Sequence, residues 1–146
     1  MADLQFVVYI KAEAEALFAT LTDPEQTPHF FMSCRIESSW ESGAPVAFVE
    51  TSRGPEGPTV VNGTVSAVEA PTTLAHTFAM MGQDDEPSTI RYALVQVPGA
   101  VKLVVDHTGL VDGSRTAALV AEAWPAILSS LKTWVETGEP LGLTQR

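Results

Sequence analysis

The first hydrophobic positions of the chain follow a strand pattern that soon changes to a helical one. Residues Leu4–Ile10 are rich in β-branched and aromatic side chains, which predicts a strand. In Ala12–Leu21, alanine, glutamate and leucine predominate and the apolar positions recur at helical spacing, which predicts a helix. The segment Asp23–Gln26 combines an N-cap aspartate, a proline at the first helical position and a glutamine shortly after it. It predicts a second short helix that ends near Phe31.

The middle of the chain alternates short apolar runs with turn residues, as consecutive β-strands do. Glycine and proline mark a loop at residues 53–58 and a hairpin turn at Pro98-Gly99. Because the connections are short, we expect an antiparallel meander rather than a parallel sheet. Gly63 is a candidate for a β-bulge within it. The predicted strands are Arg35–Trp40, Pro45–Ser52, Thr59–Ala70, Thr73–Met81, Thr89–Val97 and Ala100–Thr108.

The end of the chain predicts one long amphipathic helix from about Ala117. Its apolar positions recur at helical spacing and form one stripe, whereas polar residues fill the opposite face. Gly138 ends the helix and Pro140 follows it. Pro125 has no N–H, so it either kinks the helix or marks the start of its second half. The stripe consists of Trp124, Ile127, Leu128, Leu131, Trp134 and Val135.

This order of elements predicts an α+β fold in a single domain, residues 1–146. A meander has one apolar face that must be covered, and only the C-terminal helix carries enough apolar surface to cover it. Twisted sheets curl, and a single helix laid in such a concave surface does not fill it. We therefore expect a curved sheet wrapped around the helix, with an apolar cavity in which a small molecule binds.

Composition narrows the range of partners. Hydrophobic residues make up 45% of the 146 residues, enough for one core, and the formal net charge is -10. An acidic domain repels phosphate backbones and anionic lipid surfaces, so we expect neither nucleic-acid nor membrane binding. A lone cysteine cannot form an internal disulfide. No apolar run has the pattern of a signal peptide or the length of a membrane span. These features favour a cytoplasmic protein.

Aromatic side chains on the strands and the long helix are the best candidates for a cavity wall. Trp40 borders a turn, which favours a structural role. Trp134 lies near the helix end, where the first strand could cover it. The candidate ligand-binding residues are Phe31, Phe48, Phe78, Tyr92, His107, Trp124, Leu128 and Leu131.

The sequence offers little support for catalysis or metal binding. His29, His76 and His107 are widely separated, so we expect one exposed loop histidine and two strand histidines with ordinary hydrogen bonds. His107 shares a predicted strand face with apolar residues, where its ring needs a protein or ligand partner. Cys34 lacks a basic neighbour, which indicates a small buried hydrophobe. There is no nucleophile elbow and no phosphate loop, so we assign no catalytic residue, metal or cofactor.

A series of short motifs runs along nearly the whole chain in a characteristic order. In order and spacing they resemble the SRPBCC (START-like) superfamily, in the branch named after the activator of the heat-shock-protein-90 ATPase. This resemblance implies the helix-grip fold and a hydrophobic cavity. The motifs are Leu21-Thr22-Asp23-Pro24-Glu25, Ser39-Trp40-Glu41-Ser42-Gly43, Gly63-Thr64-Val65, Pro71-Thr72-Thr73-Leu74, Pro87-Ser88-Thr89-Ile90-Arg91-Tyr92, Val101-Lys102-Leu103-Val104-Val105-Asp106-His107, Trp124-Pro125-Ala126-Ile127-Leu128-Ser129-Ser130-Leu131-Lys132 and Glu136-Thr137-Gly138.

The chain departs from this family in two ways. Members often have two glycines before the helix tryptophan, where this chain has Glu122-Ala123, so the helix is expected to extend further back. The co-chaperone carries a separate N-terminal domain for its client, for which this chain has no room. This second departure argues against a chaperone as the partner.

Three functions remain open, because this superfamily spans carriers, receptors, cyclases and co-chaperones. The favoured one is binding of a small hydrophobic or aromatic molecule without turnover, in an unassigned stress-response or metabolic role. The second is a polyketide cyclase or aromatase in which Tyr92 or His107 moves protons. The third is a co-chaperone-type interaction domain, which predicts a filled core. A homodimer is compatible with the sequence, although no residue indicates one.

Overall fold

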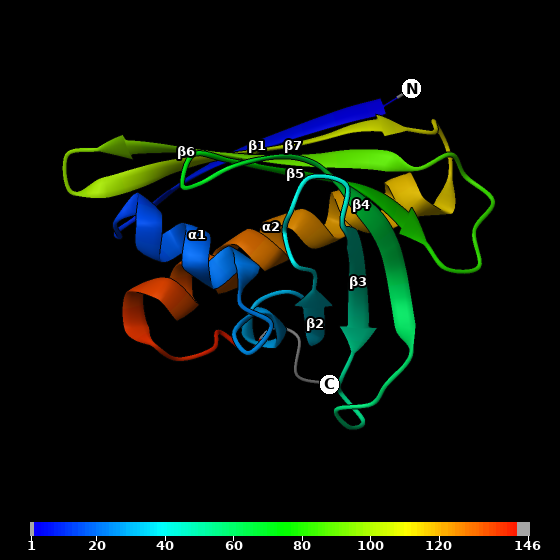
Figure 1. Ribbon diagram of the computed structural model, residues 1–146, viewed down its shortest axis with the longest axis horizontal. Coiled ribbons are helices and arrows are strands. Elements are labelled where there is room, and N and C mark those ends of the chain that lie inside the picture. Colours follow the sequence, from blue (N-terminus) through cyan, green and yellow to red (C-terminus); the bar gives the residue numbers. More distant parts are fainter. Residues whose placement is uncertain (1, 143–146) are drawn as a thin grey trace.

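The computed structural model describes residues 2–142 and is an α+β protein, as predicted (Figure 1). Its elements are, in chain order, β1 (Ala2–Ile10), α1 (Ala14–Thr22), the 3₁₀ helix η1 (Thr27–His29), β2 (Cys34–Glu37), β3 (Pro45–Glu50), β4 (Thr59–Glu69), β5 (Thr73–Met80), β6 (Ser88–Val97), β7 (Ala100–Leu110) and α2 (Arg115–Thr137).

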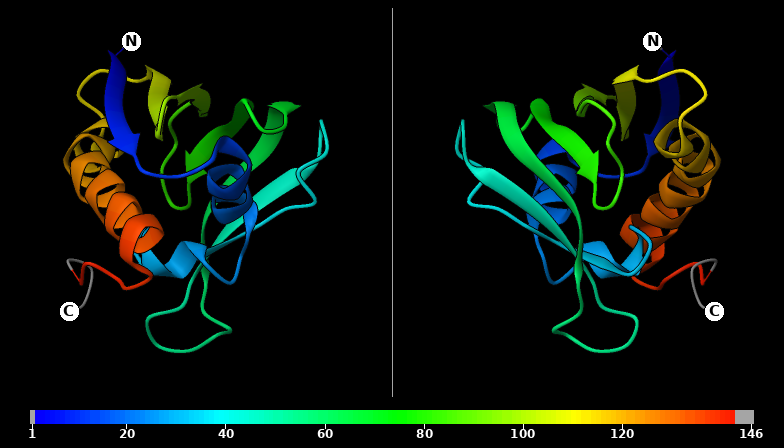
Figure 2. Two further views of the ribbon diagram at one scale, coloured as in Figure 1. Left: turned by 90° about the vertical axis from the view of Figure 1, so that its left-hand side faces the viewer. Right: turned by 90° about the vertical axis from the view of Figure 1, so that its right-hand side faces the viewer.

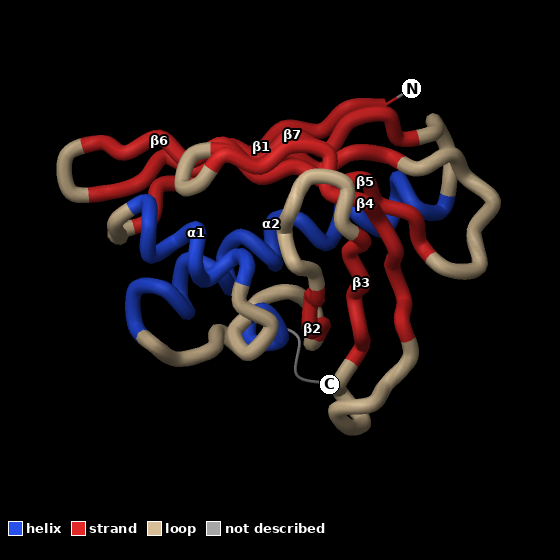
Figure 3. The backbone as a smooth tube through the Cα atoms, in the orientation of Figure 1, coloured by secondary structure: helices blue, strands red, loops and turns tan. Residues whose placement is uncertain are grey.

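The seven strands form one antiparallel sheet in the order β1-β7-β6-β5-β4-β3-β2. The sheet bends strongly between β5 and β3, and both helices lie inside the bend (Figure 3). Side views show α2 running obliquely along the open side of this bend (Figure 2). Because the apolar strand faces turn inward, they and α2 enclose a single core. The predicted sheet wrapped around the terminal helix is confirmed.

The hairpin between β6 and β7 sets the register of the central strands. Val97 pairs with Ala100 across the Pro98-Gly99 turn, where Gly99 takes a φ of 78° that suits glycine. This register places Tyr92 opposite Val105 and brings His107 to the same inner face. The predicted hairpin is therefore confirmed, together with the shared face.

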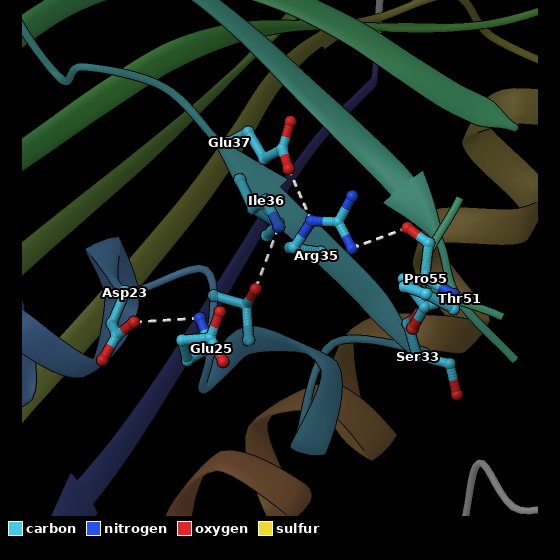
Figure 4. Close-up of polar contacts among 9 residues, drawn as sticks. Asp23, Glu25, Ser33, Arg35, Ile36, Glu37, Thr51 and Pro55 are labelled. Atoms are coloured by element: carbon cyan, nitrogen blue, oxygen red, sulfur yellow. Dashed lines mark hydrogen bonds and ion pairs between the residues drawn. The ribbon is translucent and has the colours of Figure 1, made fainter. Parts of the chain in front are cut away.

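The predicted second α-helix is wrong, because only the short 3₁₀ helix η1 forms there, although Asp23 does accept the hydrogen bonds expected at a helix start. The Asp23 carboxylate accepts a hydrogen bond of 2.9 Å from the Glu25 N–H (Figure 4). It also accepts one of 3.0 Å from the Gln26 side chain. Only a turn and the short η1 follow. The buried Thr27 hydroxyl oxygen accepts a hydrogen bond of 2.9 Å from the Ile36 N–H, which ties this segment to β2. This bond holds the segment beside β2, where the chain forms a turn and a 3₁₀ helix in place of the predicted α-helix.

The long helix α2 is continuous through Pro125, so this proline does not mark the start of a separate second half. Its N-cap is Ser114, whose hydroxyl oxygen accepts a bond of 3.0 Å from the Ala117 N–H. At the other end Gly138 adopts a left-handed φ of 78° and its N–H bonds to the Trp134 carbonyl oxygen, as predicted. The helix reaches back to Arg115, which agrees with the expectation drawn from the missing glycines.

Two details of the strands differ from the predictions. β2 ends at Glu37, and Trp40 adopts a φ of 61° that cannot continue a strand. Gly63 pairs regularly with Val46, and the register shift in β4 falls between Val65 and Ala67. The bulge is thus displaced from the glycine. Within the described residues, no helix is both long and apolar enough to cross a bilayer.

Candidate functional site

A cavity of about 280 Å³ lies between the bent part of the sheet and the first half of α2. Its walls come from the turn after η1, from β2 to β5, from β7 and from α2. Met32 and Leu119 line it and are 42% and 40% exposed, so they mark its mouth. The lining is almost entirely apolar, which suits a hydrophobic guest.

The structure brings five of the predicted site residues together and leaves three elsewhere. Tyr92, Leu128 and Leu131 are buried in the core but do not line the cavity. The cavity lies along α2 from Leu119 to Ile127, so positions nearer the C-terminus pack beyond it. The predicted residues that line it are Phe31, Phe48, Phe78, His107 and Trp124.

Several lining residues were not predicted from the sequence. Glu50 lies two positions after Phe48 on β3, so strand alternation carries both side chains to the same face. Cys34 pairs directly with Glu50 across β2 and β3. Strand alternation alone places Glu50 on the same face as Phe48. A charged side chain is seldom buried, however, so Glu50 was not counted among the lining residues. The remaining unpredicted lining residues are Met32, Val60, Val61, Met80, Leu119, Val120, Ala123 and Ile127.

A tight turn aims Phe31 into the cavity. Met32 and Ser33 adopt φ values of 52° and 61°, in the left-handed region that costs a non-glycine residue about 1–2 kcal/mol. The turn is held by the Ser33 carbonyl oxygen, which accepts bonds from the N–H and hydroxyl of Thr51 at 2.9 Å and 2.7 Å. The Phe31 ring meets the Phe48 ring edge-on, with centroids 5.2 Å apart. The turn between η1 and β2 thus supplies one wall of the site.

Trp124 on α2 and His107 on β7 join the helix to the sheet through a buried hydrogen bond. The Trp124 indole N–H donates to His107 Nδ1 at 3.0 Å, and His107 Nε2 lies 2.7 Å from the Ser88 hydroxyl oxygen. An indole N–H can only donate, so Nδ1 accepts and the imidazole proton sits on Nε2. The Ser88 hydroxyl then donates to the Phe78 carbonyl oxygen at 3.4 Å. We call Trp124, His107 and Ser88 the buried relay.

Burial keeps His107 neutral. Burial, with a smaller contribution from nearby His76, lowers the pKa of His107 to about 4. Both ring nitrogens are already bonded within the protein. His107 therefore offers the cavity an uncharged ring edge and no unused hydrogen-bonding nitrogen.

The relay predicts a measurable cost for removing its donor. Trp124→Phe retains an aromatic ring but leaves His107 Nδ1 without a partner, so the free energy of unfolding should fall by about 1–3 kcal/mol. Urea denaturation measures this loss, and Trp134→Phe serves as control, because the Trp134 indole is only half-buried. An equal effect of the two substitutions would contradict the relay.

His76 occupies the predicted strand position, whereas His29 is exposed as predicted but ends η1 and does not lie in a loop. His29 is exposed, and its ring stacks on Trp134 with centroids 4.1 Å apart. Trp134 also donates to the Gln26 side-chain oxygen at 3.0 Å, so it packs against the η1 segment. His76 is buried, and its Nδ1 donates to the Thr77 carbonyl oxygen at 2.7 Å. Burial lowers the pKa of His76.

Cys34 behaves as a buried neutral thiol. Burial, followed by the negative charge of Glu50, raises the pKa of Cys34 to about 12. The thiol is therefore a poor nucleophile at neutral pH. Among residues 2–142 no group of three histidine, cysteine, aspartate or glutamate side chains is placed to hold a metal ion.

Solved structures with the same fold are numerous. The Aha1 dimer from Colwellia psychrerythraea covers 94% of this chain and 98% of its own, with 18% identity and a TM-score of 0.77. DynU16, from the dynemicin biosynthetic locus, covers 94% of this chain and 48% of its own, with 19% identity and a TM-score of 0.79. The HSP90 activator PFC0360w from Plasmodium falciparum covers 94% and 97%, with 15% identity and a TM-score of 0.73.

At these identities the likeness establishes the helix-grip-like fold and nothing about a ligand. No curated protein matches the chain. The family model described as "Activator of Hsp90 ATPase homolog 1-like protein" matches residues 11–136, which span both helices and the whole sheet except β1. The chain therefore belongs to the AHSA1-like family, within the SRPBCC superfamily suggested by its sequence motifs.

Proposed function

We propose that this protein binds a small hydrophobic or aromatic molecule in the cavity between the sheet and α2. The observation that carries the proposal is an apolar cavity of about 280 Å³ with a mouth at Met32 and Leu119. Its size lies near the lower end of the usual range for small-molecule sites, roughly 300–1,000 Å³. A compact ring system suits this space better than a long acyl chain.

The arrangement of polar groups favours binding over proton-transfer catalysis. A general acid or base needs a free position facing the substrate and a pKa near the working pH. His107 has both nitrogens engaged and its pKa is lowered to about 4. Tyr92 does not line the cavity, and burial raises its pKa. Neither candidate for a cyclase-type proton transfer meets these requirements.

A co-chaperone-type role has weaker support. Relatives of the same fold include an HSP90 activator, but at 15% identity. An interaction domain of that kind needs no ligand-sized cavity, whereas this fold retains one between the sheet and α2. The void therefore favours an internal ligand over a purely external interface.

Filling the cavity tests the proposal. Ala123→Leu places a larger side chain on the lining of α2, and leucine is a good helix former, so the helix is retained. We expect binding of 2-naphthylmethanol, a neutral aromatic probe, to weaken at least roughly tenfold, as measured by titration calorimetry. The wild-type Trp124 indole N–H resonance should shift on addition of the probe, because this indole lines the cavity.

Ala121→Leu is the matched control, because Ala121 lies on the exposed side of the same helix and does not line the cavity. It should bind the probe like the wild type. Thermal melting checks that both variants fold. Equal affinities of the two variants, or a wild type that does not bind any compact aromatic probe, would contradict the proposal.

A further inference from the structure

One charged side chain lines the otherwise apolar cavity in the described part of the chain. Glu50, the last residue of β3, is half-buried and contributes to the wall near Cys34 and Met32. Burying a carboxylate is unfavourable unless it is paired or hydrogen-bonded. The surroundings of this carboxylate therefore indicate what it can bind.

The Glu50 carboxylate is oriented by Ser52, which follows β3. The N–H and hydroxyl of Ser52 both donate to Glu50 Oε1, at 3.0 Å and 2.8 Å. The structure places no donor from residues 2–142 on Oε2. One oxygen is thus held in position, and the other retains its capacity to accept a hydrogen bond.

No protein cation neutralises Glu50 among the described residues. Arg35, on the neighbouring strand, is bonded to the Glu37 carboxylate and to the Pro55 carbonyl oxygen, the latter at 2.8 Å. Figure 4 shows its guanidinium between these two partners. Arg53 lies exposed in the adjoining loop and forms no ion pair with Glu50 in the described chain.

The negative charge of Glu50 acts on the cavity wall. Cys34 is its cross-strand partner and also lines the cavity. The charge of Glu50 contributes, after burial, to raising the pKa of that thiol. The part of this shift that comes from the Glu50 charge acts on a cation with the opposite sign, so Glu50 attracts a cation placed beside it, whereas burial disfavours ions of either sign. The formal net charge of -10 draws cations toward the molecule in general.

We propose that the ligand is a cationic amphiphile, with an apolar or aromatic body in the cavity and a protonated amine at Glu50 Oε2. This inference rests on the proposed function and adds the class of ligand to it. The apolar walls hold the body, the neutral His107 edge does not compete for the amine, and Glu50 sets the orientation.

Three probes with the same ring system test the role of charge. They are 2-naphthylmethylamine, 2-naphthylmethanol and 2-naphthoate, which are cationic, neutral and anionic at neutral pH. We expect affinity to decrease in that order, with roughly 5- to 20-fold between amine and alcohol for a half-buried charge pair. The preference for the amine should fall as salt is raised, because salt screens partly exposed charges.

Glu50→Gln should bring the ratio of amine to alcohol affinity close to one. Glu15→Gln, at an exposed position on α1, changes the net charge equally and should retain the preference. If wild type and Glu50→Gln bind amine and alcohol with equal ratios, the cationic ligand is excluded while the cavity remains a binding site. If none of the three probes binds the wild type, the proposed function itself fails.

Discussion

Substituting alanine for Gly63 is expected to lower the free energy of unfolding by about 3 kcal/mol or more. A Cβ at this position would lie 1.9 Å from the Thr77 carbonyl oxygen on the adjacent strand β5. Because that oxygen belongs to backbone, no change of rotamer relieves the overlap, and β4 and β5 must separate. Thr77 also accepts the His76 hydrogen bond of 2.7 Å, which the separation would disturb. Urea denaturation of the purified variant measures the loss.

Gly113→Ala separates this steric effect from the general cost of replacing glycine. Gly113 has open space around its Cβ position and a φ of 74°, so only left-handed strain of about 1–2 kcal/mol is expected. A Gly63→Ala variant no less stable than Gly113→Ala would show that β4 and β5 do not approach as closely as described.

Acid should destabilise the protein through His107. Its pKa is lowered from 6.5 to about 4 in the folded state, so the unfolded chain binds a proton that the folded chain excludes. Stability is therefore fully present above about pH 6.5 and is lost as the pH falls toward about 4, by about 3 kcal/mol in total. His76, whose pKa is also lowered, adds to the loss in the same direction. Urea denaturation at a series of pH values measures this slope.

His107→Asn tests the assignment of this slope. Asparagine does not titrate, and its side-chain oxygen can still accept from the Trp124 indole. The variant should be less stable at neutral pH but should lose about 3 kcal/mol less on acidification. His29→Gln, at an exposed position outside the relay, controls for the loss of an imidazole as such. Equal acid slopes in wild type and His107→Asn would refute the role of His107.

Local patterns were sufficient for most elements of the fold. Alternation of apolar residues and the Pro98-Gly99 turn predicted the β6–β7 hairpin with its correct register. Helical spacing and Gly138 predicted α2 and its end. These signals are carried by neighbouring residues, so tertiary contacts reinforce them and do not override them. The second helix failed where a distant group intervened, namely the bond between Thr27 and the strand β2.

The lining of the cavity could be predicted only in part. Aromatic residues on inward strand faces, such as Phe48 and Phe78, were found because strand alternation is a local property. Leu128 and Leu131 share the apolar stripe of Trp124 but lie outside the cavity. Helical periodicity tells which face of α2 is buried, but it does not tell where along that face the sheet leaves space.

Apart from the second helix, the sequence by itself determined the order of elements, the antiparallel sheet, the apolar stripe of α2 and the family to which the chain belongs. Only the tertiary structure decided that Trp124, His107 and Ser88 form the buried relay. It also decided that the charged Glu50 lines an otherwise apolar cavity. The reason is physical. Periodicity acts between near neighbours, whereas a hydrogen bond between helix and sheet or an unpaired carboxylate depends on how the sheet bends around the helix.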